Sequence, residues 1–198
     1  NIDNSLRFND GDSPRLNITP SAGNRRTWTF SCWLKRGNIS SYQRIFSAYA
    51  TGDNEHLIFR DTDQLHYFSG DATIDVKTNA VYRDPSAWYH IVCAVDTTDG
   101  TAASRVKLYV NGSQVTSLAT ATYPSADADT GFNENVAHDI GRSAADAQYF
   151  DGYMSDVYFI DGTQYAASDF GETDDNGVWI PKAASVTFGT NGFKLEFQ

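Results

Sequence analysis

The chain has 198 residues, of which 40% are hydrophobic and 14% aromatic, so it can bury a sizeable core and is not expected to be disordered. It carries 15 Lys and Arg against 25 Asp and Glu, a formal net charge of −10. This balance argues against a nucleic-acid partner, because such binding depends on clustered basic side chains. No apolar run approaches the ~18 residues that span a membrane, so we expect no membrane insertion.

Short β-type runs separated by polar turns follow one another along the whole chain. Predicted strands cover residues 5–8, a second run within 11–18, and residues 25–37, 43–50, 56–60, 64–69, 72–77, 88–96, 104–110, 137–141, 149–162 and 192–197. About a dozen strands at spacings near ten residues are typical of an all-β, antiparallel two-sheet sandwich or jelly roll. No repeat or linker divides the sequence, so we interpret residues 1–198 as a single domain of a longer chain.

The strand over residues 25–37 alternates clearly. Trp28, Phe30, Cys32 and Leu34 face one way, and Thr27, Thr29, Ser31 and Trp33 face the other. We expect the first set to fill the core. Cys32 and Cys93 both lie in hydrophobic strands, where buried free thiols are the simpler interpretation, and a disulfide stays open if the two strands are neighbours.

Turn-forming residues indicate where the predicted strands are connected. Asn111-Gly112 predicts a tight hairpin turn. Residues 119–135 are small and polar and predict a long surface loop. Residues 163–171 could form one short helix, capped by Gly171.

The run "YFDGYMSDVYFIDG", residues 149–162, holds a carboxylate in the middle of an apolar strand. Strict alternation puts Tyr153, Ser155, Val157 and Phe159 on one face and Met154, Asp156, Tyr158 and Ile160 on the other. Burying an unpaired charge costs several kcal/mol. Asp156 should therefore have hydrogen-bond donors, a cation or an exposed position.

The blocks "TWTFSCWLKRG", "AWYHIVCAVD", "RVKLYVNGSQV", "HDIGR" and "YFDGYMSDVYFIDG" resemble, in this order, laminin G-like, concanavalin A-like lectin/glucanase domains. "RDPSAWYHIV" and "GVWIPK…GTNGFKLEFQ" are similar to domains of structural proteins from marine tailed phages. The resemblance implies one convex and one concave sheet, with the strand of residues 27–35 beside that of residues 88–96. Trp33 would face the concave groove or a covering loop.

Related glucanases carry paired carboxylates on one strand face, and retaining glycoside cleavage requires two of them about 5 Å apart. The stretches that come closest to such a carboxylate pattern are "DNE" at 53–55 and "ETDD" at 172–175, and we interpret both as turn-like polar stretches. His56, His66, His90 and His138 lack the spacing of metal ligands. We therefore expect no enzymatic activity.

Calcium is the cofactor that the resemblance implies, since members of this fold family bind Ca²⁺ through a late-strand carboxylate and the N-terminal loop. The matching residues are Asp156 with Asn9, Asp10 and Asp12, and their oxygen ligands suit Ca²⁺. Asp127, Asp129 and Glu134 form a second, incomplete set. The alternative for Asp156 is a carboxylate that accepts backbone N–H groups. With calcium bound, removal of divalent ions should lower the melting temperature.

Sugar recognition requires an aromatic platform and polar side chains that read hydroxyl groups. We expect exposed candidates at Trp33, Tyr67, Tyr89, Tyr123 and Tyr149, with Arg60, Asp61 and Asn54 nearby in sequence. Packing in the core is the alternative for each aromatic residue.

These observations predict a non-catalytic virion adhesion module that binds host-surface carbohydrate, acidic or neutral, from a tail fibre or as capsid decoration. The alternative is a structural virion protein that packs against copies of itself or other virion proteins without binding glycans. A third possibility is a secreted or cell-surface laminin G-type adhesion module.

Overall fold

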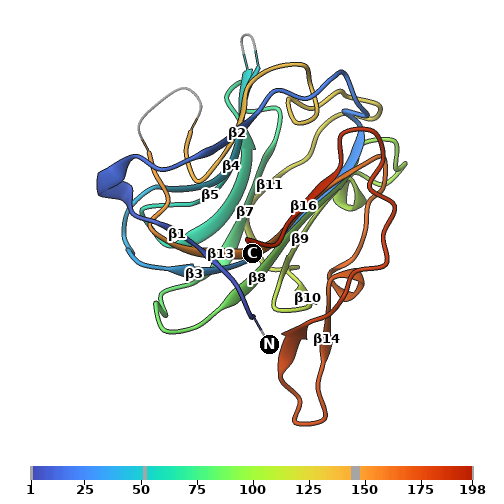
Figure 1. The fold of residues 1–198 in the computed structure, drawn as a ribbon. Helices are drawn as coiled ribbons and strands as arrows, with labels where there is room; N and C mark the ends of the chain where they lie inside the picture. The colour runs from blue at the N-terminus through green and yellow to red at the C-terminus, as the bar shows by residue number, and fades with distance from the viewer. Residues whose placement is uncertain (1, 51–52, 144–147, 198) are drawn as a thin grey trace.

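The protein forms a two-layer β-sandwich (Figure 1), seen in a computed structural model that describes residues 2–50, 53–143 and 148–197. The first sheet has the order β1 (Leu6–Phe8), β13 (Gly152–Asp161), β3 (Thr27–Arg36), β8 (Tyr89–Asp96), β9 (Val106–Val110), β10 (Ser113–Gln114), and β16 (Phe193–Leu195) also pairs with β13. The second sheet has the order β11 (Leu118–Thr122), β7 (Asp75–Val81), β6 (Gln64–Ser69), β5 (Asp53–Phe59), β4 (Gln43–Ala50), β12 (His138–Ile140), β2 (Leu16–Ile18). The strand pairs are antiparallel, which confirms the predicted all-β sandwich.

The space between the two sheets is filled as the alternation predicts. Trp28, Phe30, Cys32 and Leu34 of β3 are fully buried there. The ring of Phe30 stacks on that of Phe46 in β4, with centroids 4.7 Å apart, and Phe46 stacks in turn on Phe132 at 4.5 Å. Each such side chain contributes roughly 1.5–3 kcal/mol by leaving water, so this aromatic column is a main source of stability.

A second apolar cluster covers the outer face of the first sheet. Residues 163–192 leave β13 and cross this face, and they include η3 (Ala167–Asp169) and a hairpin of β14 (Gly171–Thr173) and β15 (Trp179–Pro181) that projects from the sandwich (Figure 1). Phe170 packs there against outward-facing Val92, Ala94 and Tyr158. Residues 163–192, which we call the C-terminal cover, therefore enclose a second apolar core on the outer face of the first sheet.

Of three local predictions, two need correction and one is confirmed. Residues 163–171 contain one 3₁₀ turn, and Gly171 begins β14 instead of capping a helix. The predicted loop 119–135 begins with a strand, because β11 extends to Thr122 and pairs with β7. The Asn111-Gly112 turn is confirmed, with φ angles of 49° and 82° in the left-handed region that Asn and Gly tolerate.

The two cysteines lie on neighbouring strands but remain free. Cys32 faces Ile91 and Cys93 faces Phe30 across the β3–β8 pair, so the thiols are offset along the strands. Burial raises the pKa of both thiols. They act as small core residues, in agreement with the simpler interpretation.

η1 (Asp10–Asp12) and η2 (Ala102–Ser104) are the remaining helical turns of the described residues. Within these residues no helix has the length and apolar character needed to cross a membrane.

Candidate functional site: a cleft at the β13 bulge

An extra residue in β13 explains the carboxylate in the apolar strand. Ser155 faces Trp33 of β3 and Tyr158 faces Ser31, so Asp156 and Val157 together oppose the single residue Cys32. This β-bulge reverses the alternation. Met154, Val157 and Phe159 point into the core, whereas Tyr158 and Ile160 pack under the C-terminal cover. The strict alternation predicted from the sequence is therefore wrong after Ser155.

Asp156 itself belongs to neither face. Its φ of 45° is left-handed, which costs a non-glycine residue about 1–2 kcal/mol. The other edge of β13 is shared by two short strands at this point. β1 ends its pairing where Leu6 faces Met154, and β16 begins where Leu195 faces Val157. Asp156 lies in the interval between them, where both ends of the chain meet.

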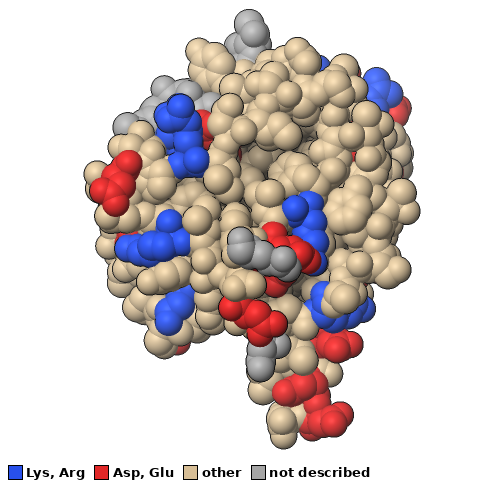
Figure 2. Space-filling model, in the orientation of Figure 1, with Lys and Arg blue, Asp and Glu red and all other residues tan. Residues whose placement is uncertain are grey.

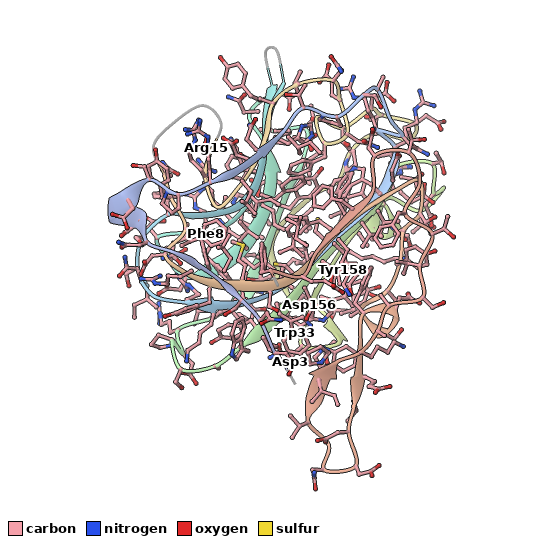
Figure 3. The ribbon with its side chains drawn as sticks, in the orientation of Figure 1. Asp3, Phe8, Arg15, Trp33, Asp156 and Tyr158 are labelled. Carbon is pink, nitrogen blue, oxygen red and sulfur yellow. The ribbon has the colours of Figure 1, made fainter. Side chains whose placement is uncertain are left out.

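This interval is a polar cleft of about 220 Å³, which we call the Asp156 cleft. It is lined by Asp3, Asn4, Ser155, Asp156, Tyr158, Pro181, Lys182, Ala183, Lys194 and Glu196. Figure 3 shows the labelled side chains of Asp3, Asp156 and Tyr158 near one another in this view. The cleft thus joins the N-terminal segment, the bulge, the residues after β15 and β16.

The hydrogen bonds inside the cleft leave Asp156 weakly held. The Ser155 hydroxyl donates to the Asn4 carbonyl oxygen at 2.6 Å and lies 3.4 Å from Asp156 Oδ2. Lys194 Nζ pairs with Glu196 and also lies 5.3 Å from the centre of the Tyr158 ring. The described residues show no backbone N–H donated to Asp156, which was the alternative to a metal.

Burial raises the pKa of the Asp156 carboxyl above its ordinary value. Lys194 and the Ser155 hydroxyl oppose this rise, whereas Glu196 and Asp3 add to it through like-charge repulsion. Burial also raises the pKa of the Tyr158 hydroxyl, which stays protonated. The cleft therefore holds a strained, partly desolvated carboxylate between two others, a combination that is common at functional sites.

The indole of Trp33 lies under the C-terminal cover, next to the cleft. Trp33 is buried, stacks on His90 with ring centroids 4.9 Å apart, and pairs in register with Ser155. Its Nε1 is buried and has no acceptor among the described residues. The prediction that Trp33 is exposed is wrong, although its outward orientation against a covering segment is as expected.

The predicted calcium ligands do not come together. Asp10 and Asp12 follow Phe8, which faces Gly152, whereas Asp156 lies beyond Met154 at the other end of the β1–β13 pairing (Figure 3). Their carboxylates accept hydrogen bonds from the side chains of Asn38 and Asn9, at 3.0 and 2.7 Å. No group of three or more His, Cys, Asp or Glu within the described ranges is arranged to hold a metal ion. The residues do not fit a calcium site shared by Asp156, Asp10 and Asp12.

The second set of candidate calcium ligands, Asp127, Asp129 and Glu134, forms ion pairs with arginines. Asp129 accepts a hydrogen bond of 2.7 Å from Arg26, and Asp127 lies 3.7 Å from the same guanidinium group. Glu134 pairs with Arg25 at 3.2 Å. These ion pairs connect the loop before β12 to the residues that immediately precede β3.

Two of the predicted sugar-binding tyrosines are core residues. Tyr67 is fully buried between the sheets, where its hydroxyl donates to the Glu55 carboxylate at 2.9 Å. Tyr89 is 8% exposed, and its hydroxyl accepts the backbone N–H of Asp84 at 3.0 Å. Both predictions of exposure are wrong, because the second sheet's inner face includes β6 and the segment after β7 covers Tyr89.

The remaining candidates lie apart from the cleft. Tyr123 is half-buried against the core beyond β11, and Tyr149 forms an isolated bridge with Arg142. The Arg60 guanidinium stacks on Tyr42, 4.8 Å from its ring centre, and donates to its hydroxyl at 3.0 Å. The structure does not unite these side chains in one site.

The stretch "DNE" belongs to β5 and is not a turn. Glu55 is buried, and it accepts the Gly131 N–H at 2.6 Å as well as the Tyr67 hydroxyl. On the opposite, outer face of this sheet His66 lies 2.8 Å from Asp75 and stacks on Phe68 at 4.6 Å. Burial lowers the pKa of His66 to about 4. His66 therefore stays neutral at physiological pH.

The sequence indicated Asp156 but missed its neighbours. Asp3, Asn4, Lys194 and Glu196 lie near the two ends of the chain, and they meet only because β1 and β16 pair with the same strand. The recurrence of short β-type runs at both ends was the available signal, but it does not specify a shared partner.

The sequence model of the Concanavalin A-like lectin/glucanases superfamily matches residues 10–180. The chain belongs to this superfamily. The match covers the second sheet and most of the first, including the bulged strand β13 but not β1 or β16, and it confirms the resemblance drawn from the sequence blocks. A search of curated proteins found no match.

Solved structures share the fold at low sequence identity. A heptameric SAP-like pentraxin from Limulus polyphemus matches 92% of this chain and 85% of its own, with 15% identity and a TM-score of 0.56. A putative carbohydrate binding protein from Bacteroides ovatus matches 89% and 59%, with 14% identity and 0.53. The enzymatically active domain of tailspike protein 2 from bacteriophage CBA120 matches 84% and 26%, with 13% identity and 0.57. The chain thus spans about a quarter of the tailspike domain's length.

Proposed function

We propose that this protein is a non-catalytic carbohydrate-binding domain and that the Asp156 cleft is its binding site. The observation that carries the proposal is a partly desolvated carboxylate, on a residue with left-handed backbone, that lines a polar cleft on a lectin-type sandwich. The fold gains no stability from this arrangement. A ligand that donates hydrogen bonds to Asp156 would offset its cost.

The lining of the cleft suits the hydroxyl groups of a sugar. Asp156 and Asp3 can accept from hydroxyl hydrogens, and the Asn4 amide can donate to or accept from hydroxyl oxygens. Hydrogen bonds to charged groups contribute about 1.5–3 kcal/mol each, enough for weak binding of a single sugar unit.

The same cleft lacks features needed for glycoside cleavage. A retaining or inverting glycosidase holds two carboxylates rigidly on either side of the scissile bond. Asp3 and Glu196 are exposed residues outside the strands, and Glu196 is paired with Lys194. Glu55, the best fixed glutamate, has its carboxylate held in the core by Gly131 and Tyr67. We therefore assign binding without hydrolysis.

The setting that we propose is the exterior of a phage virion, where the domain binds host-surface glycans and contacts other virion proteins. Support comes from the sequence blocks similar to marine phage structural proteins and from the fold shared with a phage tailspike domain. Weak single-site binding fits a repeated, multimeric display, because linked sites gain avidity. The fold shared with a heptameric pentraxin is compatible with such assembly.

A glycan array probed with a trimerised form of the protein tests the proposal. We expect binding to at least one glycan, no release of reducing sugar, and about tenfold weaker binding by Asp156→Asn, which corresponds to the loss of one charge-assisted hydrogen bond. Asp10→Asn is the matched control, since Asp10 is exposed and outside the cleft. An array without signal, or an Asp156→Asn variant that binds as the wild type does, would reject it.

A second candidate is a packing module without glycan binding. An apolar groove of about 440 Å³ lies between the free edge of β2 and β16, lined by Arg15, Leu16, Asn17, Ile18, Ile140, Phe193 and Leu195. Ile18 is 40% exposed there. If this groove joins copies of the chain, sedimentation should show an oligomer that Ile18→Asp disrupts, with an empty glycan array.

A further inference from the structure

The charges around the Asp156 cleft determine which sugars it can accept. Three carboxylates line it, those of Asp3, Asp156 and Glu196, against the two amines of Lys182 and Lys194. The balance is one excess negative charge in a chain whose net charge is −10. The charge of the lining residues therefore does not favour the binding of an anion.

The geometry makes the effective balance more negative. Lys194 is paired with the Glu196 carboxylate and lies against the Tyr158 ring, so its charge is shared between Glu196 and Asp156. Asp156 has no such partner, and its only hydrogen bond in the described chain is the 3.4 Å contact from Ser155. An anionic group entering the cleft would meet a partly desolvated carboxylate whose charge Lys194 offsets only in part.

Further acidic residues lie near the cleft and add to its negative electrostatic potential. The β14–β15 hairpin, which leads to the cleft residues Pro181 and Lys182, carries exposed Glu172 and Asp175 beside Asp174. Figure 2 shows acidic side chains beside basic ones near the middle of this face and again along the projecting hairpin. An anionic polysaccharide that reaches the cleft would pass these charges as well.

We infer that the Asp156 cleft selects neutral, hydroxyl-rich sugars and excludes sugars that carry carboxylate or sulfate groups. This inference rests on the proposed carbohydrate-binding function and narrows it. Neutral hydroxyl groups donate hydrogen bonds to Asp156 and Asp3 at no electrostatic cost, whereas an acidic sugar brings acceptors and a repelled charge to a site whose acceptors are already in excess.

Matched polymers test the inference directly. The trimerised protein is titrated with dextran and dextran sulfate, and with a neutral galactan and its sulfated counterpart, at 20 and 300 mM NaCl. We expect at least tenfold tighter binding to the neutral member of a bound pair at low salt, and a smaller ratio at high salt because salt screens the repulsion.

Asp156→Asn separates charge from shape, because the two side chains are isosteric and Asn tolerates the left-handed backbone. The variant should lower the neutral-to-anionic ratio at least threefold, and Asp10→Asn should leave it unchanged. Equal or tighter binding of the sulfated polymers, weakened by Asp156→Asn, would overturn the inference while leaving the proposed function intact. No binding of any neutral or anionic probe, here or on the glycan array, would overturn both.

Discussion

The indole N–H of Trp179 donates a hydrogen bond of 3.1 Å to Nδ1 of His90, and this contact fastens the C-terminal cover to the first sheet. His90 Nε2 lies 2.9 Å from the Ser31 hydroxyl, so both ring nitrogens are satisfied inside the protein. The imidazole stacks on Trp33, with ring centroids 4.9 Å apart, and its centroid lies 6.0 Å from that of Trp179. Pro181 and Lys182, which line the Asp156 cleft, follow Trp179 by two and three residues in the sequence.

Trp179→Phe should destabilise the protein by about 1–2 kcal/mol, because it leaves the buried acceptor on His90 without a donor. Urea denaturation followed by circular dichroism measures the change. Val178→Ala, at an exposed neighbouring position, is the control and should have little effect. An unchanged midpoint for Trp179→Phe would show that the cover does not depend on this bond.

Acid should destabilise the protein through its buried histidines. Burial lowers the pKa of His90 to about 3 and that of His66 to about 4, so the unfolded chain binds these protons more tightly than the folded one. The resulting stability is complete above the unfolded pKa near 6.5 and falls as the pH drops towards the folded values, by up to about 1.4 kcal/mol per pH unit for each histidine. His90→Gln should show a shallower loss between pH 6.5 and 4, and an identical slope would contradict this account.

The buried ion cluster at Asp63 predicts a contrast between two neighbouring acids. Asp63 is fully buried and accepts from Arg36 at 3.0 Å, Arg83 at 2.9 Å and the Ser40 N–H at 2.7 Å. Burial alone would raise its pKa, but these donors together hold it below the ordinary value, so their stabilisation is lost as the pH falls through that lowered pKa. Asp63→Asn should cost about 3–5 kcal/mol by leaving Arg36 uncompensated. Asp61→Asn, which breaks only an exposed 3.7 Å pair with Arg60, should cost less than about 1 kcal/mol.

Asp156→Asn should increase stability at pH 7. The folded state favours the protonated form of Asp156, so its ionisation opposes folding once the pH rises through the raised pKa. We expect a gain of about 0.5–1 kcal/mol after allowance for solvent screening. The gain should vanish near pH 3, where the wild-type carboxyl is protonated. A destabilised variant at pH 7 would show that the carboxylate supports the fold instead of a ligand.

Excess EDTA should leave the melting temperature unchanged. Asp10 and Asp12 lie beyond the opposite end of the β1–β13 pairing from Asp156, and each accepts a hydrogen bond from an Asn side-chain amide. This reverses the expectation drawn from the sequence. A melting temperature that falls in EDTA and returns with CaCl₂ would re-establish a calcium site.

The strands and their core faces follow from the sequence because period-two alternation reports burial directly. It correctly assigned Trp28, Phe30, Cys32 and Leu34 to the core. The bulge at Asp156 could not be predicted in the same way, because an inserted residue leaves composition and turn signals unchanged while it reverses every later side chain.

The site was less predictable than the fold. Trp33 was expected to be exposed because residues 163–192, which cover it, have no regular pattern of their own. Asp3 and Glu196 are separated by almost the whole chain, and only the pairing of β1 and β16 with β13 brings them to one cleft. Such a site depends on tertiary pairing, which local patterns do not encode.

Calorimetric titration of the trimerised protein with a glycan identified on the array, compared with Asp156→Asn, tests the central claim most directly. We predict saturable binding by the wild type and about tenfold weaker binding by the variant, whose fold is retained. Equal affinities for the two proteins would place the ligand elsewhere and contradict the assignment of the β13 bulge as the binding site.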